Sequence, residues 1–167
     1  RVYNELGGKS AFVVFDDFAN VERAAKTVAG SMFFNQGESC NAPSRVLVHD
    51  SIAERFVEIV AAETPKYRAA DPLDASTEMG ALVDEGQLRT VMGFIDAGKR
   101  EGARTVTGGT RAREASGGFY VEPTLFVDVD PKSAIAQEEI FGPVCCVIPY
   151  EGDEQAVRIA NDSIYGL

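Results

Sequence analysis

The sequence has no apolar run long enough to cross a membrane. Its longest apolar stretches, such as Ala11 to Phe15, are far shorter than the roughly 20 residues that a membrane-spanning helix needs. It also lacks collagen-like repeats and low-complexity tracts. With 45% hydrophobic and 25% charged residues, the 167 residues predict a single folded, soluble domain with one sizeable core.

Basic residues are few relative to acidic ones. The chain has 16 Lys and Arg against 26 Asp and Glu, so its formal net charge is −10. A surface of this sign repels phosphate backbones and anionic lipids, and we therefore expect neither nucleic acid nor a membrane as a partner. A nucleotide cofactor stays compatible with this charge, because local backbone N–H groups can hold phosphates.

Histidine and cysteine are scarce. His49 is the only histidine available as a base for a cysteine protease, and its place at a strand end is more typical of a surface side chain. Cys40, Cys145 and Cys146 are odd in number and have no spacing typical of a disulfide framework or a zinc site. We expect no metal, and a reducing compartment such as the cytoplasm.

Strands alternate with helices along the chain, which predicts an α/β fold with a largely parallel sheet and flanking helices. The expected strands are Ala11 to Phe15, Arg45 to Val48, Thr105 to Thr107, Thr124 to Val129 and Val144 to Tyr150. The expected helices are Val21 to Phe34, Ser51 to Tyr67, Asp84 to Glu101 and Glu154 to Asn161, the second and third opening with capping-box spacing. Arg111 to Gly118 is polar and predicts an exposed loop.

The segment Phe33 to Cys40, FFNQGESC, places a lone thiol just past a helix end in a glycine turn. A cysteine in such a turn can be exposed and reactive, whereas a free cysteine is most often a small buried hydrophobe. The turn by itself leaves both interpretations open.

Two further segments carry groups of chemical interest. In ELGGKS, Glu5 precedes a glycine pair, where close-packed backbone can desolvate a carboxylate and make it a general base. In QEEIFGPV, the acidic pair before Phe141 and the Gly-Pro turn could bind sugar hydroxyls and a flat heterocycle. Each segment taken alone is also explained by exposed carboxylates and a core phenylalanine.

Taken together and in this order, ELGGKS, FFNQGESC and EEIFGPV closely resemble the signature segments of the aldehyde dehydrogenase superfamily. The resemblance extends to the stretches between them, including GFYVEPTLFVDV and ANDSIYGL, and so covers essentially the whole chain. It is nearest to enzymes of the γ-glutamyl-aminobutyraldehyde and betaine-aldehyde type.

The resemblance implies an enzyme that oxidises an aldehyde to a carboxylic acid with NAD or NADP. Cys40 matches the family nucleophile, which forms a thiohemiacetal and then a thioester. Glu5 matches the glutamate that activates the hydrolytic water. The backbone N–H of Cys40 matches one oxyanion donor.

Other site residues follow from the same resemblance. Glu139 and Phe141 match the positions that hold the nicotinamide ribose and ring, and Leu6 and Gln87 are further expected cofactor contacts. Phe34 and Asn41 are expected to line the substrate site beside Cys40.

The chain itself is expected to be part of a longer polypeptide. Residues 1–167 resemble part of an aldehyde dehydrogenase catalytic domain with both ends truncated, and most of the cofactor domain is missing. We therefore expect no dehydrogenase turnover from this chain alone, and a parent that is a homodimer or homotetramer.

Two alternatives remain open. A CoA-acylating aldehyde dehydrogenase would release acyl-CoA in place of free acid, although relatives of that kind commonly lack a hydrolytic glutamate such as Glu5. A non-catalytic protein could keep the same scaffold, although it would have no need to retain Glu5 together with Cys40. The labelling rate of Cys40 relative to the other thiols discriminates the second alternative.

Overall fold

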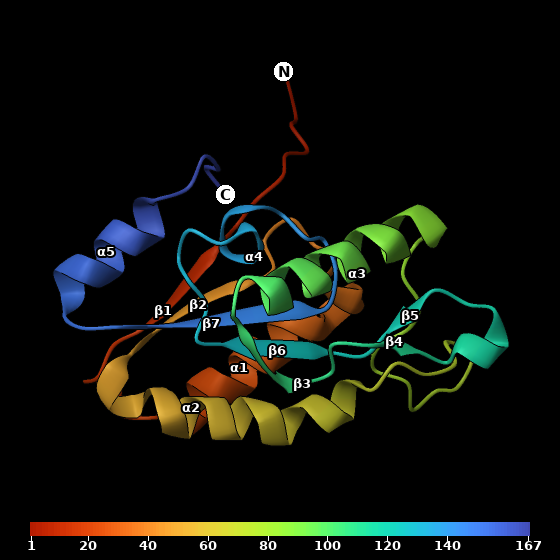
Figure 1. The fold of residues 1–167 in the computed structure, drawn as a ribbon, viewed down its shortest axis with the longest axis horizontal. Helices are drawn as coiled ribbons and strands as arrows, with labels where there is room; N and C mark the ends of the chain where they lie inside the picture. Colours follow the sequence, from red (N-terminus) through yellow and green to blue (C-terminus); the bar gives the residue numbers. More distant parts are fainter.

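A computed structural model describes all residues, 1–167, and places a five-stranded sheet between two layers of helices (Figure 1). The strand order is β1-β2-β7-β6-β3. Neighbouring strands run parallel except for β3, which pairs antiparallel with β6 at the edge. The predicted α/β fold with a largely parallel sheet is confirmed. The strands of this sheet are β1 (Ala11–Val14), β2 (Arg45–His49), β3 (Arg104–Thr107), β6 (Thr124–Val127) and β7 (Val144–Tyr150).

The helices cover both faces of the sheet. In Figure 1, α1 and α2 lie below the strands, and α3, α4 and α5 lie on the other side. None of the helices is both long and apolar enough to cross a membrane. The α-helices are α1 (Val21–Phe33), α2 (Asp50–Glu63), α3 (Glu85–Arg100), α4 (Ala134–Gln137) and α5 (Asp153–Asn161); the 3-10 helices are η1 (Phe34–Gly37), η2 (Thr64–Tyr67) and η3 (Glu114–Ser116).

Alternation along the strands divides the core into two clusters. Val46 and Val48 of β2 pack on the α1–α2 side, whereas Leu47 between them packs on the α3–α5 side. Successive strand side chains point to opposite faces, and helices cover both faces, so the inner strands β2 and β6 are almost fully buried, whereas the edge strands β1 and β3 are partly exposed. For the same reason Cys145 and Cys146 lie in different clusters, as expected for adjacent residues of a strand.

Several predicted boundaries need correction. The helix α2 does not begin with a capping box at Ser51; its N-cap is His49, whose ring nitrogen accepts from the Ser51 N–H. The segment 111–118 is not simply an exposed loop, because β4 (Arg111–Ala112) pairs with β5 (Tyr120–Val121) and buries Ala112. The short helix α4 has too few residues to produce a periodic pattern and was not expected.

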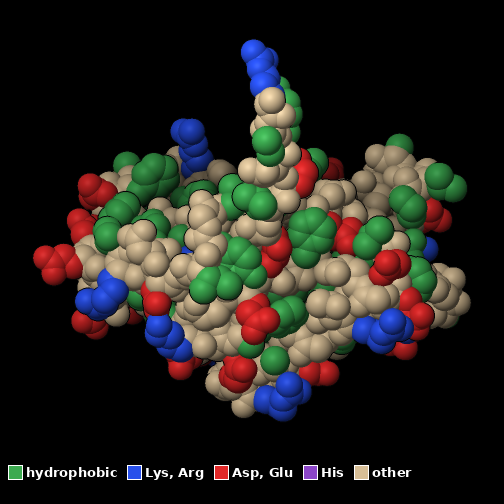
Figure 2. Space-filling model, turned by 90° about the horizontal axis from the view of Figure 1, so that it is seen from above, with side chains coloured by type: hydrophobic (Ala, Val, Ile, Leu, Met, Phe, Trp, Pro, Cys, Tyr) green, Lys and Arg blue, Asp and Glu red, His purple; other side chains and the backbone are tan.

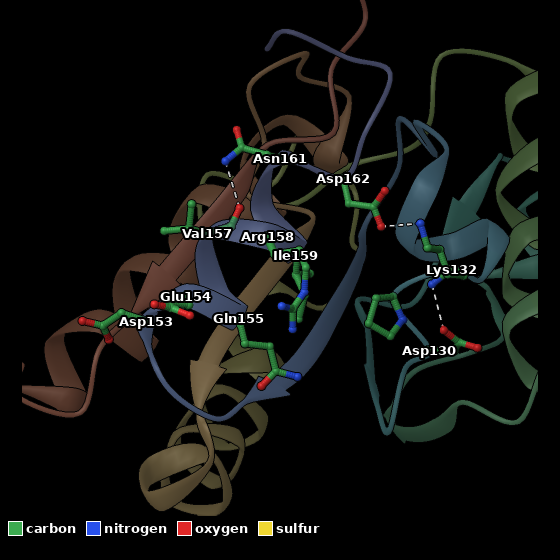
Figure 3. Close-up of a pocket in the computed structure, with 11 residues that line it drawn as sticks. Asp130, Lys132, Asp153, Glu154, Gln155, Val157, Arg158, Ile159, Asn161 and Asp162 are labelled. Carbon is green, nitrogen blue, oxygen red and sulfur yellow. Dashed lines mark hydrogen bonds and ion pairs between the residues drawn. The ribbon is translucent and has the colours of Figure 1, made fainter.

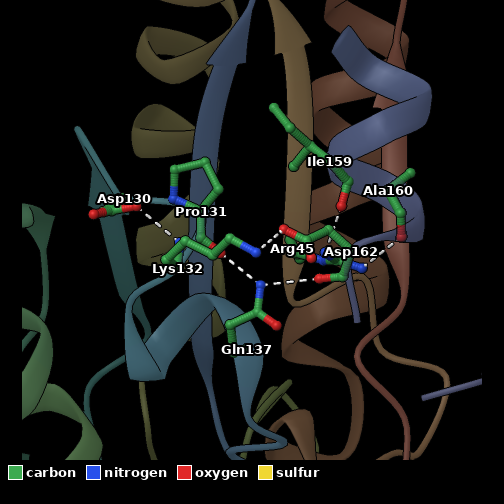
Figure 4. Close-up of polar contacts among 8 residues, drawn as sticks. All are labelled: Arg45, Asp130, Pro131, Lys132, Gln137, Ile159, Ala160 and Asp162. Carbon is green, nitrogen blue, oxygen red and sulfur yellow. Dashed lines mark hydrogen bonds and ion pairs between the residues drawn. The ribbon is translucent and has the colours of Figure 1, made fainter. Parts of the chain in front are cut away.

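Arg45 of β2 is buried and ties both ends of the chain to the sheet. Its Nη1 donates to the Ile159 carbonyl at 2.9 Å, and its Nη2 donates to the Ala160 carbonyl at 3.0 Å (Figure 4). The same Nη2 also donates to the Lys9 carbonyl at 3.2 Å. A cation at a helix C-terminus satisfies free carbonyls and the helix dipole together. Arg45 therefore holds the end of α5 against the segment that leads into β1.

Lys9 is buried just before β1, and its Nζ has no hydrogen-bond partner. Burial lowers the pKa of its ammonium group below 10.5, and the nearby Arg45 cation lowers it further, whereas Cys146, Cys145 and Glu139 oppose this shift. A charged group without a partner in the interior costs folding free energy. Burial of Lys9 therefore lowers the free energy of unfolding.

Replacing Lys9 with Met removes that cost, and we expect Lys9→Met to raise the free energy of unfolding at pH 7 by about 1–3 kcal/mol. Because the folded-state pKa lies below the unfolded value, the unfolded state binds more protons between the two, and wild-type stability rises with pH through this window. The advantage of the variant should therefore shrink as pH rises toward 10.5.

Urea unfolding across this pH range measures both effects. The matched control is Lys66→Met, at an exposed lysine of η2, which should change the free energy of unfolding by no more than about 0.5 kcal/mol. A less stable Lys9→Met variant would show that the buried ammonium group makes net favourable contacts.

Candidate active site

Cys40 lies in a turn between α1 and β2. The helix ends at Phe33, and η1 follows it with Asn35, Gln36 and Gly37 at φ of 48°, 58° and 71°. The Ala42 N–H donates to the Ser39 carbonyl at 3.1 Å, which closes the turn around Cys40. Cys40 is only partly buried, so the interpretation as a fully buried thiol is wrong.

The backbone N–H of Cys40 donates no hydrogen bond within the chain. An unpaired N–H beside a partly exposed thiol is available to a negatively charged oxygen that forms next to the sulfur. The other two thiols differ. Cys145 and Cys146 are 1% and 0% exposed, and burial raises the pKa of Cys146 to about 11 and that of Cys145 further still.

The segment Glu5 to Gly8 reaches the Cys40 turn through the glycine pair. A Cβ atom at Gly8 would lie 2.4 Å from the carbonyl oxygen of Cys40. Backbone is the obstacle here and cannot rotate away, so only glycine permits this approach. The two segments that carry the expected nucleophile and base are thereby brought into direct contact.

The third segment closes the same junction. The Gly8 N–H donates to Glu139 Oε1 at 3.0 Å, and a Cβ at Gly7 would lie 2.4 Å from Glu139 Oε2. A Cβ at Gly37 would lie 2.3 Å from the Gly142 carbonyl oxygen. The residues around Glu5, Cys40 and Glu139, far apart in sequence, thus meet at one place.

Glu5 itself is exposed, in agreement with the simpler interpretation of its segment, so the glycine pair does not desolvate its carboxylate. Residues 1–7 have no regular secondary structure and rise away from the sheet (Figure 1). Close approaches to Glu139 and Cys40 come at Gly7 and Gly8, at the end of this stretch and just after it. Glu5 is therefore linked to the Cys40 junction through the chain that leads to Gly8.

Phe141 has a left-handed backbone, with φ of 53°, and its side chain is 40% exposed. Gln87 of α3 holds this backbone, because its Nε2 donates to the carbonyls of Ile140 at 3.0 Å and Phe141 at 2.7 Å. The amide nitrogen of Gln87 is thus occupied, which leaves only its oxygen for the expected cofactor contact.

The remaining expected site residues are exposed. Leu6 is 65% exposed and Phe34 is 68% exposed. Asn41 is also exposed, and its Oδ1 accepts from the Ser39 hydroxyl at 2.8 Å. Figure 2 shows hydrophobic side chains around the base of the N-terminal segment, with acidic side chains among them.

Tyr165 was missed as a neighbour of the site. Its hydroxyl lies 3.4 Å from the Glu139 N–H, which donates to it, and its ring lies beside Gly7. The stretch ANDSIYGL near the end of the chain contains this residue, but nothing local indicates that it returns to the start of the chain. A backbone hydrogen bond from the Lys9 N–H to the Leu167 carbonyl, at 3.1 Å, joins the same two parts of the chain.

A large open groove of about 1000 Å³ lies elsewhere, between α5 and the turn that contains Asp130 and Lys132 (Figure 3). Most of the residues that line it are polar or charged, and two of them, Lys132 and Asp162, form an ion pair. None of the expected site residues lines this groove. The junction around Cys40 remains the candidate active site.

A known protein family matches the chain along its whole length. Residues 1–167 match the model described as the aldehyde dehydrogenase family. The chain belongs to this family. The family match also covers the whole stretch that contains Glu5, Cys40 and Glu139.

Individual aldehyde dehydrogenases show how much of the fold is shared. Aminoaldehyde dehydrogenase 2, peroxisomal, of Malus domestica is 40% identical over 163 residues, which are 98% of this chain and 32% of that protein. The crystal structure of gamma-glutamyl-gamma-aminobutyraldehyde dehydrogenase from Burkholderia cenocepacia J2315 is 52% identical with a TM-score of 0.94, over 98% of this chain and 33% of that one.

A third relative was solved with a cofactor. Betaine aldehyde dehydrogenase from Staphylococcus aureus, in complex with NAD+, is 37% identical with a TM-score of 0.91, over 98% of this chain and 32% of that one. The chain therefore spans about a third of the length of these aldehyde dehydrogenases.

The contact between Gly8 and Cys40 predicts the effect of an added methyl group. Gly8→Ala should lower the free energy of unfolding by about 1–3 kcal/mol or displace the Cys40 turn, because the Cβ meets backbone at 2.4 Å. Urea unfolding and the alkylation rate of Cys40 measure these two outcomes.

Gly93→Ala is the matched control. Gly93 is an exposed residue of α3 with nothing within 4 Å of an added Cβ. This substitution should stabilise the chain by about 0.5–1 kcal/mol, because alanine is the better helix former. Equal effects of the two substitutions would contradict the close approach at Gly8.

Proposed function

We propose that residues 1–167 form part of the catalytic domain of a longer aldehyde dehydrogenase, which oxidises an aldehyde to a carboxylic acid with NAD or NADP. The observation that carries this proposal is the contact between Gly8 and the Cys40 carbonyl, since it joins the segments of nucleophile and base. The chain spans about a third of its relatives, so we expect no dehydrogenase turnover from it alone.

In this proposal Cys40 is the nucleophile. Its thiolate sulfur bonds to the aldehyde carbon, and the π electrons of the carbonyl move onto oxygen to give a thiohemiacetal anion. The free N–H of Cys40 donates to this oxygen. Loss of hydride from the carbon then restores the carbonyl and leaves a thioester on Cys40.

NAD or NADP, when bound, supplies the acceptor for that hydride. The residues that would hold it are Glu139, Phe141 and Leu6, with Gln87 supporting Phe141. They fit such a group: the Phe141 ring is partly exposed, and Glu139 Oε2 accepts no hydrogen bond within the chain. Because Gly7 has no side chain, none occupies the space between its backbone and this oxygen.

Glu5 is the base for the second half of the reaction. Its carboxylate takes a proton from water as the water oxygen bonds to the thioester carbon. The carbon–sulfur bond then breaks, which releases the carboxylic acid and returns the thiolate of Cys40. Glu5 is close to Gly8 in sequence, and Gly8 contacts Cys40, so the carboxylate is tethered near the thioester.

Relatives suggest the kind of aldehyde. The names of the Malus domestica, Burkholderia cenocepacia and Staphylococcus aureus proteins specify aminoaldehydes, γ-glutamyl-aminobutyraldehyde and betaine aldehyde. We propose an amino-aldehyde for the present protein, and phenylalanine side chains such as Phe34 as part of its binding site with Asn41. We further propose a homo-oligomer. The cytoplasm remains a prediction, since the Malus domestica relative is named as peroxisomal.

An activated ester tests the nucleophile without a cofactor. p-Nitrophenyl acetate should acetylate Cys40 of the 167-residue chain and release one equivalent of nitrophenolate, while Cys145 and Cys146 stay unmodified because they are buried. Glu5→Gln should slow subsequent loss of the acetyl group by roughly 10²-fold, because water then lacks its base. Mass spectrometry of the intact chain and its peptides measures both steps.

Cys40→Ser should abolish the burst, and Glu54→Gln, on an exposed face of α2, should leave both rates unchanged. Acetylation of the three thiols at equal rates would contradict the role proposed for Cys40. Deacetylation that is indifferent to Glu5→Gln would remove Glu5 as the base.

A further inference from the structure

The backbone just before Cys40 is unusual. Asn35, Gln36 and Gly37 adopt left-handed φ angles in succession, at 48°, 58° and 71°. This conformation is unfavourable for residues that have a Cβ atom. Because Cys40 follows this left-handed run closely, whatever holds the run also orients the thiol.

Contacts within the run explain only part of its conformation. The Glu38 N–H donates to the Asn35 carbonyl at 3.0 Å, and the Asn35 side-chain amide donates to the Glu38 carbonyl at 2.9 Å. Asparagine tolerates left-handed backbone well because its short amide bonds locally in this way. Gln36 has no equivalent local support, since its amide nitrogen reaches only Asn35 Oδ1, at 3.4 Å.

Two side-chain oxygens connect the run to a distant segment of the chain. Gln36 Oε1 accepts from the Gly80 N–H at 3.3 Å, and Glu38 Oε1 accepts from the Val83 N–H at 3.1 Å. Both donors belong to residues 80–83, which we call the clasp segment. The two hydrogen bonds join residues 44 and 45 positions apart in the sequence.

The clasp segment is itself anchored. The Ala70 N–H donates to the Met79 carbonyl at 3.0 Å, and the Leu82 N–H donates to the Phe119 carbonyl at 2.9 Å. Met79 and Leu82 are 1% and 4% exposed. The amides of the clasp segment are therefore fixed donors, and they hold the left-handed run from outside.

We propose that Gln36 and Glu38 are positioning residues for Cys40. Their side-chain oxygens bind the amides of Gly80 and Val83, hold the left-handed run, and thereby fix the direction of the thiol and of its free N–H. Neither residue touches the reacting atoms in this role. The inference rests on the proposed function of Cys40 as the nucleophile.

The Glu38 carboxylate invites a different explanation, in which its charge acts on the nearby thiol through space. The two explanations are separable by chemistry. Glu38→Gln removes the charge and keeps an oxygen that accepts the Val83 N–H, whereas Glu38→Met removes both and keeps the length of the side chain. Gln36→Met removes the oxygen that accepts from Gly80 and changes no charge.

The experiment compares two reactions of Cys40 in the 167-residue chain. Acetylation by p-nitrophenyl acetate needs a directed thiol and an oxyanion donor, whereas alkylation by iodoacetamide needs only access to the sulfur. Glu38→Met and Gln36→Met should lower the ratio of acetylation to alkylation rates by roughly tenfold to 10²-fold, because a misdirected nucleophile loses its near-attack geometry. Glu38→Gln should keep the wild-type ratio.

Cys145 and Cys146 serve as internal monitors of unfolding. They are buried and should resist both reagents as long as the chain is folded. An unchanged ratio in both Met variants would overturn the proposal, and so would a fall in the ratio that is accompanied by labelling of Cys145 and Cys146, since that assigns the contacts to global stability. If Glu38→Gln lowers the ratio as Glu38→Met does, the charge of Glu38 and not its hydrogen bond acts on Cys40, and the proposal is overturned.

Hydrogen exchange tests the clasp independently of reactivity. The amides of Gly80 and Val83 should be protected in the wild-type chain, and Gln36→Met and Glu38→Met should each expose only the amide of its own partner. Absence of protection in the wild type would overturn the clasp even if Cys40 is reactive. Protection at both amides in a chain whose Cys40 resists acetylation would instead count against the proposed function alone.

Discussion

The site depends on close approaches between backbones. At Gly8 and Gly37 there is no room for a Cβ atom, because the carbonyl oxygens of Cys40 and Gly142 would lie 2.4 and 2.3 Å from it. Three segments meet here: one begins at Glu5, one ends at Cys40 and one follows Glu139. They can meet only because these positions carry glycine. The chemistry proposed for the chain is therefore made possible by missing side chains as much as by the thiol and the carboxylates.

The sheet supplies the frame for these approaches. Parallel pairing of β1, β2 and β7 sets the segments that precede these strands at one edge of the sheet, where Gly8, Cys40 and Gly142 lie. Arg45 reinforces this edge from within the core, because it binds the carbonyl of Lys9 and the end of α5. Packing of the same core offsets the folding free energy that is lost by burying Lys9 without a partner.

Much of this could be predicted from the sequence, and the rest fails for identifiable reasons. The bounds of β7 are those expected, since an apolar run after Gly-Pro is a strong local signal. The predicted α2 N-cap is wrong because the ring nitrogen of His49 accepts from the Ser51 N–H, and histidine is not among the residues that usually mark an N-cap. The occupied amide of Gln87 depends on contacts with the distant residues Ile140 and Phe141, which no local pattern records.

Local rules are broken most clearly where the chemistry is expected. Non-glycine residues with positive φ include Asn35 and Gln36 before the thiol and Phe141 beside the proposed cofactor site. In each case hydrogen bonds from another element hold the strained backbone: the clasp segment for the run before Cys40, and Gln87 for Phe141. In the proposed function, this strained backbone orients the nucleophile and an aromatic ring of the cofactor site. The same dependence makes each site residue sensitive to side chains that never touch a substrate.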